Sequence, residues 1–422
     1  MLAFVLMLSY SSAAEIDDTD YLEELFSPEE YPSDMDTLEE FIQSYYLLLD
    51  SNEYLTNFKF IKADKNQLEA DAKALRPFYE KLLELRSGLR NRVSIYQIGD
   101  SHIQSGYFSG TARSSLQKYY GNAGRGLIFP LRLAGTNQPD DYRISSTSGF
   151  SRINGDRGIC GYSMNADDGA ALEISTNNFF GLDNSFNKLS IISSQTGMKP
   201  ELKSIENCEK VSLDLGDYHY NSLSWADPKR NIGLKFSGES SRLYGLMLER
   251  QDPGLLYHAM GLNGAGFYNL TDSPRIFEQV GLLNPDLIII SLGTNDAQGN
   301  YRNEQFVANL KKFMSLLRKG NPDTPVLFTL PPDSNKRGKH NADLAKVEKS
   351  IIDFARDNNC AWWDLGKVMG GRGSVVKWRS QQMASKDLMH FTPKGYMLQG
   401  YLFYQAMINS YKEFSEKPSG KE

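Results

Sequence analysis

Three stretches of the sequence carry side chains that could cooperate in acyl transfer. Ser101 and Asn295 each lie in a glycine-led polar turn directly after an apolar run, and Asp387 and His390 lie three residues apart near the C-terminus. A serine hydroxyl is a weak nucleophile until a neighbouring base takes its proton, and histidine is the usual base near neutral pH. A carboxylate on the other ring nitrogen fixes the imidazole tautomer and stabilises the imidazolium. The set predicts Ser101 as nucleophile, His390 as base and Asp387 as its acidic partner.

A serine that attacks an ester also needs hydrogen-bond donors for the negative oxygen of the tetrahedral intermediate. The backbone N–H of Ser101, the side-chain amide of Asn295 and an N–H from a glycine-rich loop would serve. Loss of one such donor typically costs roughly 3 to 4 kcal/mol of transition-state stabilisation. Ser101 and Asn295 are therefore predicted to contribute to one oxyanion hole.

The elements around these residues predict a parallel sheet. Apolar runs are typical of strands that are buried on both faces, and amphipathic runs between them are typical of helices. The expected strands are 93–98, 287–292, 325–330 and 360–365, and the expected helices are 306–317 and 344–354. Their alternation implies a three-layer, doubly wound α/β fold. In such a sheet ligands bind at the carboxyl ends of the strands, which selects the turns of Ser101 and Asn295.

The stretch with Asp387 and His390 precedes a predicted C-terminal helix. Thr392 is a good N-cap and Pro393 a good first helical residue, so the acid and the base would lie in a loop that is free to point at the sheet edge. Taken singly, each stretch also fits an ordinary structural role as a turn or a helix cap. Their order along the chain favours catalysis.

The residues before the first strand are expected to form a leader and a helical extension. Residues 1–14 are an apolar run that ends in small residues, which is typical of a secretory signal peptide, with a frayed apolar terminus as the alternative. The rest, 15–92, is acidic at first and then helical, with helices expected at 37–49 and 67–89. Pro77 predicts a kink or a fresh helix start. We expect a secreted or periplasmic protein without a membrane span in the mature chain.

Between residues 140 and 248 the alternation of strands and helices fails. Short strand candidates separated by Gly, Asn, Asp and Ser clusters predict an inserted all-β sandwich. These candidates are 189–193, 211–215, 232–236 and 243–248, with period-2 alternation at Val211, Leu213 and Leu215 and at Ile232, Leu234 and Phe236. The catalytic domain would then comprise 93–139 and 249–415, followed by a tail at 416–422.

Composition limits the classes of partner. A chain of 422 residues with 40% hydrophobic and 23% charged residues is typical of a globular protein larger than one ordinary core. The net charge of −6 argues against a nucleic-acid partner. Cys160, Cys208 and Cys360 fit no metal or CxxC spacing. Neither a metal nor a cofactor is predicted. Either a disulfide between Cys160 and Cys208 or free buried cysteines would fit the sequence.

These features resemble the SGNH/GDSL hydrolase superfamily, whose four sequence blocks occur here in order. The resembling segments are Gly99-Asp100-Ser101 for the nucleophile, Gly261-Leu262-Asn263-Gly264-Ala265 for the glycine block, Gly293-Thr294-Asn295-Asp296 for the asparagine block and Asp387-x-x-His390 for the acid and base. The resemblance implies an SGNH/flavodoxin-like sheet. It also implies that Gly264, with Gly261 as the alternative, donates to the oxyanion hole.

One residue departs from the usual pattern, because His102 follows the nucleophile where the superfamily commonly has leucine. The variant Gly-Asp-Ser-His-Ile-Gln resembles the peptidoglycan O-acetylesterase group, in which a carbohydrate-binding-module-like β-sandwich interrupts the catalytic domain. The predicted insert at 140–248 has the matching position. His102 is expected to pack against the floor of the site, and Asp100 and His258 are candidates for its lining. His219 and His340 are expected to have surface or loop roles.

The sequence therefore predicts an exported serine esterase that removes O-acetyl groups from a glycan, with peptidoglycan or another polysaccharide as substrate. An O-acetyltransferase would use the same three side chains and pass the acetyl group to a sugar hydroxyl. A catalytically inactive glycan-binding protein is a third hypothesis, and it is disfavoured because every expected catalytic residue is present.

Overall fold

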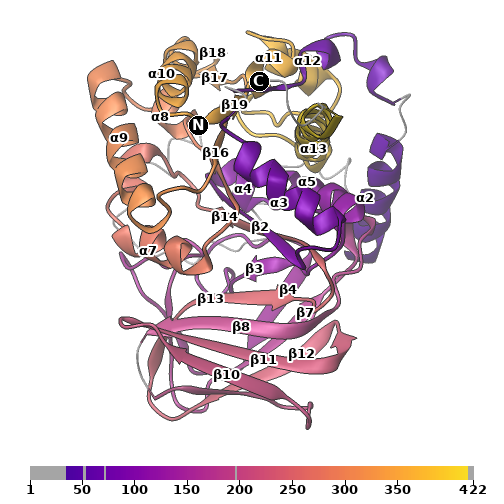
Figure 1. The fold of residues 1–422 in the computed structure, drawn as a ribbon. Helices are drawn as coiled ribbons and strands as arrows, with labels where there is room; N and C mark the ends of the chain where they lie inside the picture. The colour runs from indigo at the N-terminus through magenta and orange to yellow at the C-terminus, as the bar shows by residue number, and fades with distance from the viewer. Residues whose placement is uncertain (1–34, 51–53, 71–72, 195–196, 417–422) are drawn as a thin grey trace.

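The computed structural model describes residues 35–50, 54–70, 73–194 and 197–416. Figure 1 shows helices around one sheet and, below them, a part built of antiparallel strands. The predicted signal peptide at 1–14, the leader up to residue 34 and the tail from 417 lie outside the described residues. No described helix combines the length and the apolar character that a membrane span requires.

A six-stranded sheet with the order β1-β19-β16-β15-β2-β14 forms the centre of the helical part. Its strands are β1 (Leu68–Glu69), β2 (Arg92–Gly99), β14 (Gly254–Gly261), β15 (Leu287–Ser291), β16 (Val326–Thr329) and β19 (Ala361–Trp363). All neighbours are parallel except β1, which runs antiparallel to β19. The five parallel strands follow the flavodoxin-like order, so the strand order reverses between β2 and β15. The predicted doubly wound α/β fold is confirmed.

Apolar side chains on both faces of this sheet pack against two layers of helices. On one face Ile95 and Ile289 belong to a buried cluster with α2 (Met35–Asp50), α3 (Arg76–Arg86), α5 (Tyr107–Tyr120) and α13 (Pro393–Glu416). On the other face Ile98 and Ile290 pack with α7 (Pro274–Leu283), α9 (Asn303–Gly320) and α10 (Leu344–Asp357). Successive side chains of a strand point to opposite faces, so one continuous apolar run supplies both layers.

Short helices occupy the connections and the sheet edge. They are α4 (Ser101–Gln104), α6 (Phe267–Leu270), α8 (Thr294–Gln298), α11 (Leu365–Val368) and α12 (Ser374–Ser380), with 3-10 turns at Tyr54–Asn57, Ala63–Lys65 and Phe179–Gly181. Two of them, α4 and α8, directly follow the strands between which the strand order reverses.

The strands between α5 and β14 form two antiparallel sheets, β10-β11-β8-β13-β6-β5 with β3 beside β13, and β4-β7-β12-β9. They are β3 (Gly126–Ile128), β4 (Tyr142–Ser146), β5 (Phe150–Arg152), β6 (Met164–Ala166), β7 (Ala171–Thr176), β8 (Phe186–Ser194), β9 (Lys199–Leu202), β10 (Glu209–Asp214), β11 (Tyr218–Lys229), β12 (Asn231–Ser237) and β13 (Ser241–Glu249). A separate hairpin pairs β17 (Asn335–Lys336) with β18 (Lys339–His340). β3 precedes the expected boundary at residue 140, and the limits of an inserted domain stay predictions.

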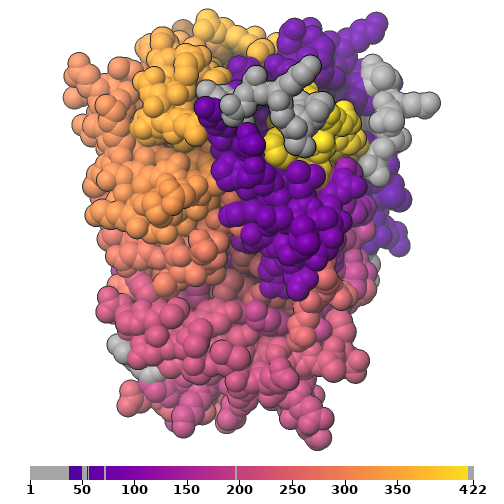
Figure 2. Space-filling view, in the orientation of Figure 1, coloured from indigo at the N-terminus to yellow at the C-terminus, as the bar shows by residue number. Residues whose placement is uncertain are grey.

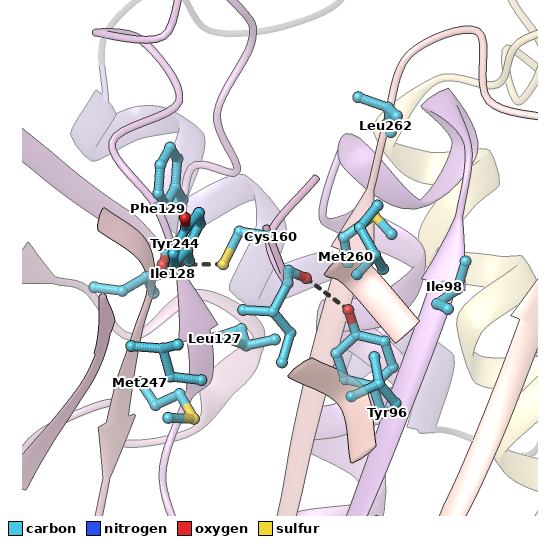
Figure 3. Packing of buried hydrophobic residues seen from close by; sticks show 14 of the residues in the cluster. Tyr96, Ile98, Leu127, Ile128, Phe129, Cys160, Tyr244, Met247, Met260 and Leu262 are labelled. Carbon is cyan, nitrogen blue, oxygen red and sulfur yellow. Dashed lines mark hydrogen bonds between the residues drawn. The ribbon is translucent and has the colours of Figure 1, made fainter. Parts of the chain in front are cut away.

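The buried core continues from the parallel sheet into the antiparallel sheets. One cluster contains Tyr96 and Ile98 of β2 together with Ile128 of β3 and Tyr244 of β13, and Figure 3 shows Leu127 and Cys160 filling the space between the two groups. The Tyr96 hydroxyl donates a hydrogen bond to the carbonyl oxygen of Ile159 at 2.6 Å. The two parts are also in direct contact on the face drawn in Figure 2. The antiparallel sheets are therefore packed firmly against the sheet that carries Ser101.

The alternation of apolar and polar residues at 211–215 predicts a strand correctly, but neither face of that strand is buried. Val211, Leu213 and Leu215 are 51%, 47% and 40% exposed, and every residue of β10 is exposed. The same pattern in β12 is buried at Ile232 and Phe236, as expected, because these side chains belong to the core cluster. A period of two predicts extended structure, and the packing against the strand decides whether either face is covered.

The predicted helix at 67–89 is wrong over its first half. Leu68 and Glu69 form β1 against β19, and α3 begins at Arg76 with Pro77 in its first turn. Proline lacks an N–H and fits the first turn of a helix, so it marks a fresh start here and not a kink.

The three cysteines carry no disulfide in this structure. Cys160 and Cys360 are buried, and Cys208 is partly exposed. Of the two options that fitted the sequence, the structure has the free thiols.

The packing predicts where substitutions destabilise the fold. Ile289→Ala removes a fully buried side chain from β15, and we expect it to lower the free energy of unfolding by about 2–5 kcal/mol. The control Leu213→Ala changes an exposed side chain on β10 and should alter that free energy by no more than about 0.5 kcal/mol. Urea denaturation followed by circular dichroism measures both, and equal losses would contradict the two assigned environments.

Candidate active site

Ser101 is the first residue of α4, directly after β2, at the point where the strand order reverses. Asp100 is the N-cap of α4 and accepts a hydrogen bond from the backbone N–H of His102 at 3.0 Å. Gly99 permits this tight turn, because a Cβ there would lie 2.1 Å from Cγ1 of Ile103. The Gly-Asp-Ser sequence therefore ends the strand, caps the helix and presents the serine side chain at the sheet edge.

Two hydrogen bonds join Ser101, His390 and Asp387 into a chain. Ser101 Oγ lies 3.1 Å from His390 Nε2, and His390 Nδ1 lies 2.6 Å from Asp387 Oδ2. Because Nδ1–H donates to the carboxylate, Nε2 is left to accept from the serine hydroxyl. The structure thus brings together the three side chains that the sequence predicts for the nucleophile, the base and the acid.

The loop before α13 holds Asp387 and His390 in position. Asp387 Oδ1 accepts hydrogen bonds from the backbone N–H groups of Met389 at 2.9 Å and His390 at 3.0 Å. Thr392 Oγ1 accepts from the backbone N–H of Gly395 at 3.3 Å, so Thr392 caps α13 as predicted. The helix start and the Asp387 side chain together fix the backbone that carries the imidazole.

The Asp387 carboxylate is partly exposed and strongly acidic. Its partial desolvation opposes ionisation, but the hydrogen bond and charge of His390 and two backbone amides outweigh this effect and lower the pKa of Asp387 to about 2. The group is therefore ionised throughout the neutral range. An ionised carboxylate at this position stabilises positive charge on the His390 ring.

The glycine loop after β14 lies beside the serine turn. Gly261 ends β14 in register with Gly99, and a Cβ on Gly261 would lie 2.1 Å from the backbone nitrogen of Gln104. Gly264 has φ +71°, and a Cβ there would meet nothing within 4 Å. Gly261 is thus packed against α4, whereas a side chain at Gly264 would meet open space.

Asn295 connects the glycine loop with the serine turn. It lies in α8 after β15, and its Nδ2 donates to the carbonyl oxygen of Ala265 at 2.9 Å. The same nitrogen lies 3.4 Å from Asp100 Oδ2, which is long for a hydrogen bond. One amide hydrogen is therefore well paired and the other is only weakly held.

Two buried carboxyl groups adjoin these turns. Burial raises the pKa of Asp100 from its ordinary 3.8 to about 7, although the amide of His102 and the charge of His390 act in the opposite direction. Burial also raises the pKa of Asp296 to about 7. Both groups therefore titrate near neutral pH instead of near pH 4.

His102 packs beside the His390 ring and takes no part in the hydrogen-bond chain. The two ring centroids are 5.4 Å apart, and His102 Nδ1 lies 3.0 Å from the hydroxyl of Tyr396. Burial, together with the neighbouring His390, lowers the pKa of His102 to about 3. His102 is therefore neutral at physiological pH and does not repel a positive charge on His390.

The other histidines have different neighbours. His258 lies inside β14, paired with Tyr96, and not at the strand end, so the structure does not bring it to Ser101. His219 Nε2 lies 2.6 Å from Ser212 Oγ on the β10–β11 hairpin, and His340 belongs to β18. Within the described ranges, no group of three or more His, Cys, Asp or Glu side chains is arranged to hold a metal ion.

Sequence reasoning missed the polar side chains that support the serine turn. Tyr396 reaches His102, and Gln104 accepts a hydrogen bond from the backbone N–H of Asn263 at 2.7 Å, across 159 residues of chain. Gln104 stands three residues after Ser101, but its spacing carries no signal of a partner so distant. Only the fold brings these two segments together.

A family comparison agrees with this architecture. Residues 232–398 match the GDSL-like lipase/acylhydrolase family. The matched segment contains Gly264, Asn295, Asp387 and His390, while Ser101 lies outside it. None of the curated proteins matches the sequence.

Solved structures give a second comparison. A structure titled "Peptidoglycan O-acetylesterase in action, 5 min" aligns with a TM-score of 0.69 at 21% identity over 82% of this chain and 99% of that chain. The acetylxylan esterase Axe2 from Geobacillus stearothermophilus aligns at 16% identity over 38% of this chain and 73% of that chain, with a TM-score of 0.30. The first match and the family match confirm the predicted resemblance to SGNH/GDSL hydrolases in fold.

The raised pKa of Asp100 predicts a pH-dependent stability. Between about pH 4 and pH 7 the unfolded chain has this carboxyl ionised while the folded chain keeps it protonated, so raising the pH through this window destabilises the fold. Asp100→Asn stays neutral and escapes this loss. We expect the melting temperature of the variant, relative to wild type, to rise between pH 4 and pH 8. A difference that is the same at both pH values would refute the assignment.

Proposed function

We propose that this SGNH/GDSL-type acylhydrolase is an exported serine esterase that removes O-acetyl groups from a glycan. The observation that carries the proposal is the hydrogen-bond chain from Ser101 through His390 to Asp387, at the carboxyl ends of the strands where the strand order reverses. Open α/β sheets bind their ligands at this position. A serine, an imidazole and an ionised carboxylate in this order support acyl transfer.

In the proposed reaction His390 Nε2 takes the proton of Ser101 Oγ as the oxygen attacks the ester carbonyl. Asp387 stabilises the imidazolium through Nδ1–H. The tetrahedral intermediate collapses, His390 returns the proton to the leaving sugar oxygen, and an acetyl group remains on Ser101. Water then attacks the acyl-enzyme with His390 again as base, which releases acetate and restores the serine.

The negative oxygen of each tetrahedral intermediate needs donors that are already in place. The first N–H groups of a helix lack partners within that helix, which leaves the N–H of Ser101 available. Gly264 and the weakly held amide hydrogen of Asn295 would complete the oxyanion hole. Each such donor is worth roughly 3 to 4 kcal/mol in the transition state.

The choice of substrate rests on two supports. The sequence Gly-Asp-Ser-His-Ile-Gln resembles the peptidoglycan O-acetylesterase group, and the aligned structure with the TM-score of 0.69 is titled a peptidoglycan O-acetylesterase. We therefore propose O-acetylated peptidoglycan as the first substrate to test, with other O-acetylated polysaccharides next. The apolar run in residues 1–14 supports export.

Ser101→Ala tests the proposed nucleophile. We expect its kcat on p-nitrophenyl acetate, and its release of acetate from O-acetylated peptidoglycan, to fall by about 10⁴–10⁶-fold, because no oxygen remains to form the acyl-enzyme. Ser105→Ala is the matched control. It also removes a serine hydroxyl, the one that donates to the carbonyl oxygen of His102, and it should keep near-normal activity. Near-full activity of Ser101→Ala would overturn the proposal.

Two further measurements on wild type and Ser101→Ala separate the two other hypotheses. If the protein is an O-acetyltransferase, a glycan acceptor added with the ester gains acetyl groups, seen by mass spectrometry, at the expense of free acetate. If it is an inactive glycan-binding protein, wild type binds glycan but is not labelled by a fluorophosphonate probe. Labelling of wild type and not of Ser101→Ala supports the esterase or the transferase.

Asp387→Asn tests the role of the ionised carboxylate. The change removes the negative charge and permits the wrong imidazole tautomer, so we expect kcat to fall by about 10⁴-fold while KM changes little. Initial rates with p-nitrophenyl acetate measure this effect, and equal thermal melting of wild type and variant provides the control for folding. A loss below tenfold would contradict the proposed role.

A further inference from the structure

Gln104 ends α4, and its buried carboxamide lies where three separate segments of the chain meet. The side chain is 2% exposed. Its Oε1 accepts a hydrogen bond from the backbone N–H of Asn263 at 2.7 Å. Its Nε2 donates to Thr136 Oγ1 at 2.8 Å and lies 2.9 Å from Asn137 Oδ1. The carboxamide therefore ties α4 both to the glycine loop and to the segment at 136–137.

The bond to Asn263 acts on the residue directly before Gly264. The same loop is held close to α4 at its start, because a Cβ on Gly261 would lie 2.1 Å from the Gln104 backbone nitrogen. The Asn263 side chain also donates to Asn137 Oδ1 at 2.8 Å. The peptide between Leu262 and Asn263 is thus held by a side chain of the helix that begins with Ser101.

Replacing the carboxamide by another side chain of similar size removes at least one of these hydrogen bonds. A glutamine amide offers one acceptor oxygen and two donor hydrogens, and here the oxygen faces an N–H while the nitrogen faces only oxygens. Methionine would leave the Asn263 N–H without its acceptor. Glutamate would keep that acceptor but would turn an oxygen towards the two carbonyl oxygens of Asn137.

We infer that Gln104 is a positioning residue that holds the oxyanion-hole loop at the correct distance from Ser101. The inference rests on the proposed esterase function. Gln104 acts through Asn263 on Gly264 and does not itself touch the ester, because its polar atoms are already bound to protein groups. Preorganised donors stabilise an oxyanion only within a narrow range of distance, so a small displacement of the loop slows acylation.

Gln104→Met is the primary test. We expect kcat for p-nitrophenyl acetate to fall by about 10–100-fold, with KM within about twofold of wild type. The reason is that the hydrogen bonds from the displaced loop to the oxyanion form mainly in the transition state. Gln104→Glu retains an oxygen that can accept from the Asn263 N–H and should keep more of the wild-type kcat. The pH at which the rate is half-maximal should not change, because His390 and Asp387 are untouched.

Gln279→Met is the matched control. Gln279 is also fully buried, and its Oε1 accepts from the backbone N–H of Ile159 at 2.7 Å, so this variant also frees a loop amide from a buried glutamine. We expect it to lower the melting temperature without lowering kcat. Phenylboronic acid provides a second readout, since it forms a tetrahedral adduct on serine. Its Ki should rise in Gln104→Met in proportion to the loss of kcat and stay unchanged in Gln279→Met.

Three results would overturn the inference. These are a folded Gln104→Met variant with a kcat within twofold of wild type, an equal loss of kcat in Gln279→Met, or an unchanged Ki for phenylboronic acid. If Gln104→Met does not fold, Gln104→Ala, which also removes the acceptor of the Asn263 N–H, carries the test, and a wild-type kcat together with a wild-type Ki in that variant would count against the inference. Failure of the proposed function looks different, because Ser101→Ala would then be active.

Discussion

The hydrogen bond between Ser101 Oγ and His390 Nε2 is the contact on which the rest of the site depends. It joins two residues 289 positions apart in the chain, so it forms only when β2 and the start of α13 are both in place. β2 is fixed in the sheet by β14 and β15, and α13 packs on one sheet face with α5. The apolar core therefore serves the chemistry by holding two short polar turns at one distance.

Burial and hydrogen bonding together set the charges around that contact. The hydrogen bonds and the charge of His390 lower the pKa of Asp387 to about 2, so it stays ionised, whereas burial raises the pKa of Asp100 to about 7. His102, against the His390 ring, is kept neutral by burial. The ionised Asp387 thus faces the base from the side opposite the serine, and the neutral His102 does not repel the imidazolium of the proposed mechanism.

The sequence predicts the parts of this arrangement that local patterns encode. Glycine-led turns after apolar runs located Ser101 and Asn295, and the cap at Thr392 located the start of α13. Local patterns do not tell whether a strand face is covered by other side chains, and β10 is exposed although its sequence alternates. They also predict one helix at 67–89, where the structure has the strand β1 followed by α3, which begins at Arg76. The bond from Asn263 to Gln104 was out of reach because no periodicity relates residues that meet only in the folded sheet.

A trapped acyl-enzyme tests the central claim most directly. Wild-type protein is mixed with p-nitrophenyl acetate, quenched in acid within the first turnover, digested and analysed by mass spectrometry. The account predicts one acetylated peptide, the one that contains Ser101, which appears before acetate accumulates and decays as turnover proceeds. Acetylation at another residue, or steady hydrolysis with no acetylated Ser101 at any quench time, would contradict it.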